Sequence, residues 1–63
     1  MYKEKDIIHE NGKYWVCRDT KQKMYIVFSN GVTHATSDSG YPLSADGFSL
    51  AMARCDYLAS RQA

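Results

Sequence analysis

The fold of this chain is decided by the stretch Lys23-Met24-Tyr25-Ile26-Val27-Phe28-Ser29-Asn30-Gly31-Val32-Thr33-His34-Ala35-Thr36. Its first half is rich in apolar and aromatic residues, which favour a β-strand. Asn and Gly tolerate the positive φ that a type I′ turn needs at both central positions, so Asn30-Gly31 predicts a tight hairpin. The residues before this corner then pair with those after it: Ser29 with Val32, Phe28 with Thr33, Val27 with His34, and Ile26 with Ala35.

A second Asn-Gly pair, Asn11-Gly12, predicts another two-residue turn earlier in the chain. With this corner, Glu10 lies opposite Lys13, His9 opposite Tyr14, and Ile8 opposite Trp15. The aromatic and β-branched residues after the turn favour a strand, and a polar connection then leads into the next one. The sequence therefore predicts strands at about 6–9, 13–18, 23–29 and 32–37, the first being the shortest.

The last third of the chain has a helical pattern over about 45–60. Ser44 is suited to cap the helix, and Asp46 favours the positive end of its dipole. One apolar stripe follows helical spacing: Phe48, Ala51, Met52, Cys55, Leu58 and Ala59. Residues 37–42 have the composition of a loop and include a proline. We therefore expect an α+β fold, a three- to four-stranded antiparallel β-meander with one C-terminal α-helix packed on one face.

Sixty-three residues predict a single small domain, 1–63, near the lower limit at which a chain folds alone. The formal net charge is +1, whereas nucleic-acid modules usually carry a clear basic excess. No leader-like segment and no apolar run of membrane-spanning length is present, so we expect a cytoplasmic protein without membrane contact. Two cysteines in a reducing compartment are more typical of buried apolar side chains than of a disulfide.

The titratable residues do not follow the spacing of a known type of catalytic or metal centre. His9, Cys17, His34 and Cys55 would supply two cysteines and two histidines, but structural zinc ligands usually come in close pairs. A Cys–His nucleophile needs the two groups within hydrogen-bond reach, but Cys17 and His34 lie on predicted strands that need not be neighbours. We therefore expect no enzymatic activity, no cofactor and no metal.

The aromatic residues are the most informative functional feature, because Tyr and Trp are enriched at protein interfaces. Both faces of the two central strands carry apolar or aromatic groups, and one helix covers only one face. We expect the contact surface on the face away from the helix, with Tyr14, Tyr25 and His34 as candidates. Trp15 and Cys17 form the alternative exposed set, depending on which face the helix covers.

The segment Asn11-Gly12-Lys13-Tyr14-Trp15-Val16-Cys17-Arg18-Asp19 resembles the N-terminal arm-binding domain of phage tyrosine integrases. Those domains continue as a three-stranded sheet followed by a helix, and the sheet enters the major groove of DNA. The resemblance implies DNA contacts at Tyr14, Arg18, Lys21 and Lys23, although the nearly neutral charge departs from that role. In size and element order the chain is also similar to short uncharacterised proteins of enterobacterial prophages.

The sequence thus predicts a small binding module that acts by protein–protein contact, and the resemblance to prophage proteins implies a phage or prophage accessory role. The first alternative is a DNA-binding protein that uses its sheet as the arm-binding domains do. The second alternative is a self-associating module, because a short chain with surplus apolar sheet surface can complete its core as a homodimer. The partner is accordingly an unidentified protein, a second copy of the chain, or DNA.

Overall fold

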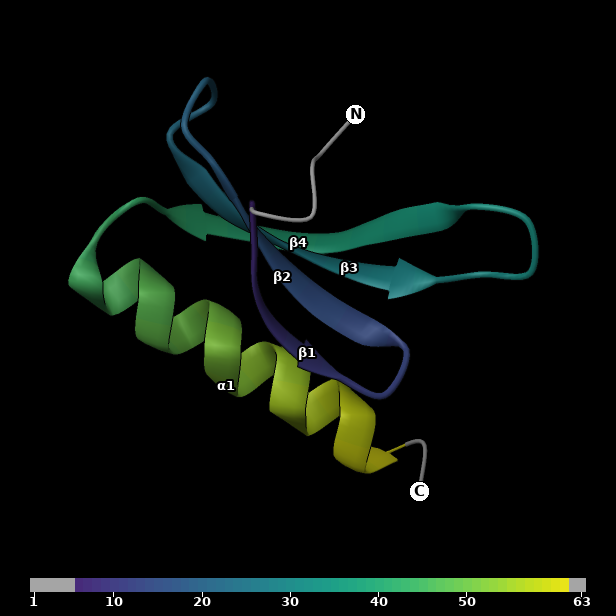
Figure 1. Cartoon of the computed structure of the whole chain (residues 1–63). Helices are drawn as coiled ribbons and strands as arrows, with labels where there is room; N and C mark the ends of the chain where they lie inside the picture. The colour runs from purple at the N-terminus through teal and green to yellow at the C-terminus, as the bar shows by residue number, and fades with distance from the viewer. Residues whose placement is uncertain (1–5, 62–63) are drawn as a thin grey trace.

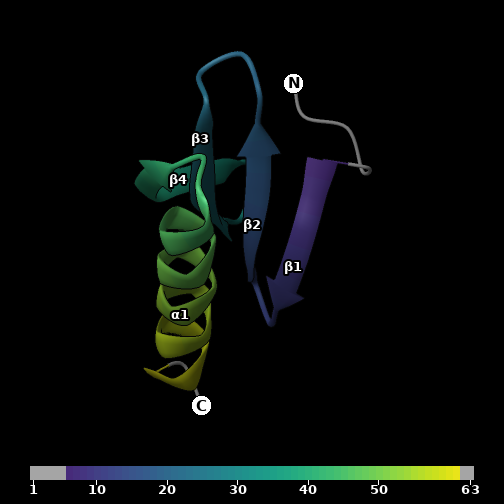
Figure 2. The same ribbon diagram turned by 90° about the vertical axis from the view of Figure 1, so that its left-hand side faces the viewer.

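The structure, a computed structural model, describes residues 6–61 of the chain. Four strands are followed by one helix: β1 (Ile7–Asn11), β2 (Tyr14–Asp19), β3 (Met24–Asn30), β4 (Ala35–Pro42) and α1 (Ala45–Arg61). The strands form one antiparallel sheet in the order β1-β2-β3-β4. The helix packs across the sheet and contacts all four strands, β1 least (Figures 1 and 2). The predicted α+β meander with a C-terminal helix is confirmed.

The first hairpin turns one residue later than the sequence predicts. Asn11 pairs with Tyr14, so the two loop residues are Gly12 and Lys13, and Glu10 faces Trp15 instead of Lys13. Gly12 has a φ of 62°, whereas Lys13 has no positive φ. A positive φ at the first loop residue alone is the pattern of a type II′ turn, which needs glycine there. Gly12 therefore sets the register, and Asn11 belongs to the strand.

The β2–β3 connection is a four-residue loop that the buried Asp19 holds together. Asp19 pairs with Met24 across the loop. Its Oδ1 accepts hydrogen bonds from the backbone N–H groups of Lys21 and Gln22, each at 3.0 Å. Lys23 closes the loop with a φ of 56°, the left-handed residue that often ends such a turn.

The β3–β4 hairpin differs most from the prediction. Asn30 pairs with Ala35, and the loop 31–34 is closed by the backbone N–H of Gly31, which donates to the carbonyl of His34 at 2.9 Å. The type I′ turn at Asn30-Gly31 is therefore wrong, because Gly31 has no positive φ. The tip of this hairpin projects away from α1 (Figure 1).

As a consequence, β4 covers Ala35–Pro42 instead of 32–37, and the predicted loop at 37–42 is part of the strand. The register shifts between Val27 and Phe28, which pair with Ser39 and Ser37, so Asp38 is the extra residue of a β-bulge. Pro42 is tolerated because it ends an edge strand, where the N–H group that proline lacks is not needed for a hydrogen bond between inner strands.

Small residues on α1 bring the helix close to the sheet. The buried helix residues are Gly47, Ala51 and Cys55, one turn apart from each other, and they face a core that includes Val16 and Val27. The cap is confirmed, because the N–H of Gly47 donates to Ser44 Oγ at 3.1 Å. A stripe of small residues leaves no room for a large side chain at its centre. Phe48, expected in the apolar stripe, accordingly lies at the flank and is 40% exposed.

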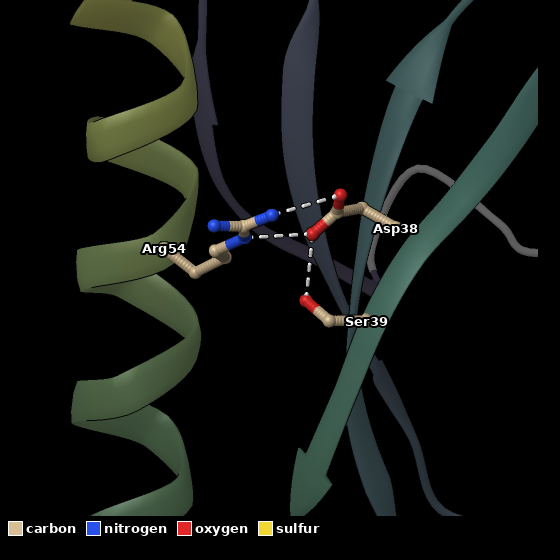
Figure 3. Close-up of polar contacts among 3 residues, drawn as sticks. All are labelled: Asp38, Ser39 and Arg54. Atoms are coloured by element: carbon tan, nitrogen blue, oxygen red, sulfur yellow. Dashed lines mark hydrogen bonds and ion pairs between the residues drawn. The ribbon is translucent and has the colours of Figure 1, made fainter.

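Polar side-chain contacts join the helix to both edge strands. Arg54 donates two hydrogen bonds to the Asp38 carboxylate, at 2.8 and 3.3 Å, and Ser39 Oγ donates a third at 2.9 Å (Figure 3). The Arg54 guanidinium lowers the pKa of Asp38 below its ordinary value. On the other edge, His9 Nε2 lies 2.8 Å from Oδ1 of Asp56. The bulge in β4 thus directs the Asp38 side chain toward the helix.

Candidate functional site

The position of the helix decides which face of the sheet is available for contacts. Tyr14 is 7% exposed in the core beneath α1, and Tyr25 packs against the same core. Tyr25 also meets Phe48 edge to face, with ring centroids 5.6 Å apart. The expectation that these two tyrosines lie on the face away from the helix is therefore wrong. They share a face because Tyr25 pairs with Arg18, which alternation places on the same face of β2 as Tyr14.

His34, the third predicted contact residue, lies in the β3–β4 loop and is exposed. Its Nδ1 is 2.9 Å from Oγ1 of Thr33, a local contact within that loop. The structure therefore does not bring His34 together with Tyr14 and Tyr25. The reason is the longer loop, which moves His34 out of the strand and away from Val27.

The face of the sheet opposite the helix, hereafter the outer face, carries the alternative set of side chains. Its apolar residues follow from the strand register and from alternation: Ile7, Trp15, Cys17, Met24, Ile26 and Phe28. Cys17 and Ile26 of this set are buried, whereas the other four side chains are partly exposed. A shallow groove on this face is lined by several residues of β3 and β4, among them Met24, Ile26, Phe28 and Gly40.

Trp15 and Phe28 form an aromatic platform on the outer face. They are directly paired across β2 and β3, and their rings stack with centroids 4.4 Å apart and an interplanar angle of 17°. The indole N–H of Trp15 donates to Oδ1 of Asn30 at 2.9 Å, which fixes the ring. Both residues remain partly exposed. The platform is a rigid apolar surface whose polar group already has a partner.

Of the four residues that the integrase resemblance implies as DNA contacts, the three basic ones lie at one end of β2 and Tyr14 lies at the other. Lys21 and Lys23 are in the β2–β3 loop, and Arg18 is exposed near that end of β2 on the helix side. Tyr14, at the opposite end of β2, is buried. Its neighbour Lys13 lies in the β1–β2 turn, far from the two loop lysines along the strand.

The two cysteines are free and buried. Burial raises the pKa of the Cys17 thiol to about 11, and the carboxylates of Asp6 and Asp19 add to the shift. At neutral pH this thiol is protonated, which makes it a poor nucleophile. Cys17 and His34 lie on a strand and in a distant loop, so the structure does not assemble the pair considered in the sequence.

One group of metal-ligating side chains within residues 6–61 does come together, at the contact between β1 and α1. It consists of His9, Cys55 and Asp56, whose ligand atoms all lie within 4.8 Å of one another. The sequence draws attention to His9 and Cys55, whereas Asp56 lies outside the predicted apolar stripe of the helix. The sequence gives little indication of this group, because His9 meets Cys55 and Asp56 only through the pairing register of β1, at the other end of the chain.

Comparison of the chain with protein-family models, with curated proteins and with solved structures finds no match in any of the three. Among the described residues, no helix has the length and apolar character to cross a membrane.

Proposed function

We propose that this protein is a small binding module that contacts a partner protein through the outer face of its sheet. The observation that carries the proposal is the stacked Trp15–Phe28 platform on the face opposite the helix. Large aromatic side chains dominate the binding energy of interfaces because they bury much area and lose little rotamer entropy. Two such rings, held in place before binding, form a pre-organised contact.

The chemistry around the platform indicates the kind of partner. The Trp15 N–H is satisfied by Asn30, so the two rings present apolar carbon to a ligand. The adjacent groove is lined by Met24 and Ile26, and methionine adapts its shape to different partners. Exposed polar residues, Glu10 and Asn30, border the aromatic pair. An apolar centre with a polar rim is typical of a protein–protein interface. The partner should therefore present an aliphatic or aromatic side chain to the platform.

The placement of basic residues favours this proposal over the DNA-binding alternative. A DNA reader needs several cations on one surface to release counterions from the phosphates. Here Arg18, Lys21 and Lys23 lie at one end of β2 and Lys13 at the other, and within residues 6–61 the strand positions of the outer face carry no Lys or Arg. Self-association through the same platform is the other alternative, and solution mass distinguishes it.

The test compares variants in affinity capture from an enterobacterial lysate, quantified by mass spectrometry. Trp15→Ala and Phe28→Ala remove the platform, and Tyr57→Ala is the matched control, an exposed aromatic on the helix. We expect a partner that the native chain and Tyr57→Ala retain and that both platform variants lose at least about tenfold. Circular dichroism verifies that each variant is folded. A partner that Tyr57→Ala loses and the platform variants keep would contradict the proposal.

Light scattering of the purified chain tests the two alternatives. We expect the mass of a monomer, unchanged by added duplex DNA at about 50 mM salt, where electrostatic binding is strongest. A doubled mass that Trp15→Ala returns to the monomer would instead establish the outer face as a homodimer interface. A salt-sensitive DNA complex that is lost with Lys21→Ala and Lys23→Ala would favour the arm-binding alternative.

A further inference from the structure

The contact between β1 and α1 gathers a nitrogen, a sulfur and an oxygen ligand around one point. Three atoms that lie within 4.8 Å of one another share a point no more than about 2.8 Å from each. Zinc binds His nitrogen, Cys sulfur and carboxylate oxygen at about 2.0–2.3 Å. Each donor atom of His9, Cys55 and Asp56 therefore lies within about 0.8 Å of the distance at which it would bind one shared ion.

We propose that His9, Cys55 and Asp56 form a binding site for a divalent zinc-type cation, with a water molecule as the fourth ligand. This site is independent of the outer face, because it lies on the helix side of the sheet. The ligands come from the first strand and the C-terminal half of the helix, so a bound ion would link the two ends of the fold.

The surroundings of the three side chains suit a metal site. Cys55 is fully buried, His9 is partly buried and Asp56 is exposed, so the site is closed on the core side and open to solvent at the carboxylate. The open side provides an entry path and room for the water ligand. Asn11 Nδ2 donates to Asp56 Oδ1 at 2.9 Å. Such an outer hydrogen bond orients a ligand and is a regular feature of metal sites.

Binding of the ion replaces side-chain contacts that contribute little to the stability of the fold. His9 Nε2 and Asp56 Oδ1 form a polar contact at the surface, and exposed contacts of this kind contribute little to stability. The cation takes the Cys55 sulfur as a thiolate, so the S–H bond breaks, a metal–sulfur bond forms, and one proton is released to solvent. Thiolate and carboxylate together balance the two positive charges of the ion. A sulfur and an imidazole ligand select a zinc-type cation over Mg²⁺ and Ca²⁺, which prefer oxygen.

The test is a titration of the full chain with Co²⁺, a spectroscopic substitute for Zn²⁺, after treatment with chelator and reductant. We expect one equivalent to give a sulfur-to-cobalt charge-transfer band and the visible absorption of tetrahedral Co²⁺. Excess Zn²⁺ should remove both and raise the melting temperature, and Mg²⁺ should do neither. His9→Gln and Asp56→Asn should weaken binding by more than about 100-fold, and Asn11→Ala by about 10- to 100-fold.

Cys55→Ala should abolish the charge-transfer band, and Cys17→Ser is the matched control that should keep it, because Cys17 lies on the outer face. His34→Gln controls for the histidine. Since Cys55 is buried, the two surface variants at His9 and Asp56 keep the test decisive if Cys55→Ala fails to fold. The proposal is overturned if no charge-transfer band forms, or if the band survives in both His9→Gln and Asp56→Asn.

Discussion

At the scale of single residues, a glycine in the first turn of the helix lies directly against the backbone that precedes the helix. A Cβ atom at Gly47 would lie 1.7 Å from the carbonyl oxygen of Pro42, in the backbone just before α1. Glycine disfavours a helix interior relative to alanine by about 0.8–1.0 kcal/mol. From the sequence Gly47 is therefore only a weak helix former, whereas in the structure it allows the helix to begin directly against the end of β4.

We expect Gly47→Ala to lower the free energy of unfolding, by about 1–3 kcal/mol, although alanine is the better helix former. The added methyl group meets backbone, which has to shift. Urea denaturation measures the change. The control is Ala53→Gly at an exposed position of the same helix, which should cost about 0.8–1.0 kcal/mol by propensity alone. A Gly47→Ala chain more stable than the native one would show that the helix start is not as close as described.

The Asp38–Arg54 pair predicts a pH dependence with a definite sign. The hydrogen bond from Arg54 lowers the pKa of Asp38 from its ordinary value of 3.8, so the folded chain binds this proton less readily than the unfolded chain. The resulting stability is present above the ordinary value and is lost as the pH falls through the lower, folded value. Asp38→Asn and Arg54→Gln should therefore flatten the acid limb of a plot of stability against pH.

The measurement is chemical denaturation repeated across the acid range. Arg61→Gln is the matched control, because its guanidinium lies over the Tyr57 ring at 5.7 Å. If stability falls equally steeply with decreasing pH in the native chain and in Asp38→Asn, the Asp38–Arg54 pair does not stabilise the fold as described.

At the scale of elements, two identical Asn-Gly pairs have different roles. Gly12 has the positive φ that a two-residue turn needs, whereas Gly31 closes a four-residue loop without one. The sequence motif predicts that the chain turns at each pair, and it does. The loop length depends on the residues after the pair, and Val32-Thr33-His34 leaves the strand pattern to form the tip. The last strand therefore begins later than the predicted range 32–37, while the strands before it are placed within two residues.

We expect Gly31→Val to destabilise the β3–β4 hairpin through contact rather than through φ. A Cβ at Gly31 would lie 2.7 Å from the backbone oxygen of His34, the atom that closes the loop. Gly40→Ala in the same hairpin is the comparison, because its Cβ would meet the flexible end of Met24. Thermal unfolding should show a clear loss for Gly31→Val, about 1–3 kcal/mol, and a smaller one for Gly40→Ala. Equal losses would contradict this assignment.

The helix offers a third test of packing. Phe48→Ala should cost less than the roughly 3–5 kcal/mol typical of a buried phenylalanine, because Phe48 is 40% exposed and its main partner is Tyr25. Denaturant unfolding gives the value. A loss of about 3 kcal/mol or more in the free energy of unfolding would place Phe48 in the core. The helix would then face the sheet with the apolar stripe that the sequence predicts.

At the scale of the whole molecule, the sequence predicts a sheet layer and a helix layer but does not show which face of the sheet the helix covers. Alternation in β2 separates Tyr14 and Val16 from Trp15 and Cys17, and both pairs are apolar enough to be core. The choice depends on a long-range match: Ala51 and Cys55 on the helix are small and fit against Tyr14 and Val16. No pattern of neighbouring residues in the sequence reveals this fit between the helix and β2. For the same reason the contact residues chosen from sequence, Tyr14 and Tyr25, belong to the core, and the alternative residue Trp15 faces outward.

The central claim, contact with a partner protein through the outer face, is tested most directly by photo-crosslinking in an enterobacterial extract, the source that the resemblance to prophage proteins implies. One chain carries Glu10→p-benzoylphenylalanine at the exposed rim of the outer face, opposite Trp15, and its matched control carries Tyr57→p-benzoylphenylalanine on the exposed side of α1. We predict a discrete crosslink to a partner protein from position 10 and none to that protein from position 57. A crosslink to the partner protein from position 57 alone, or only to a second copy of the chain from position 10, would contradict the claim.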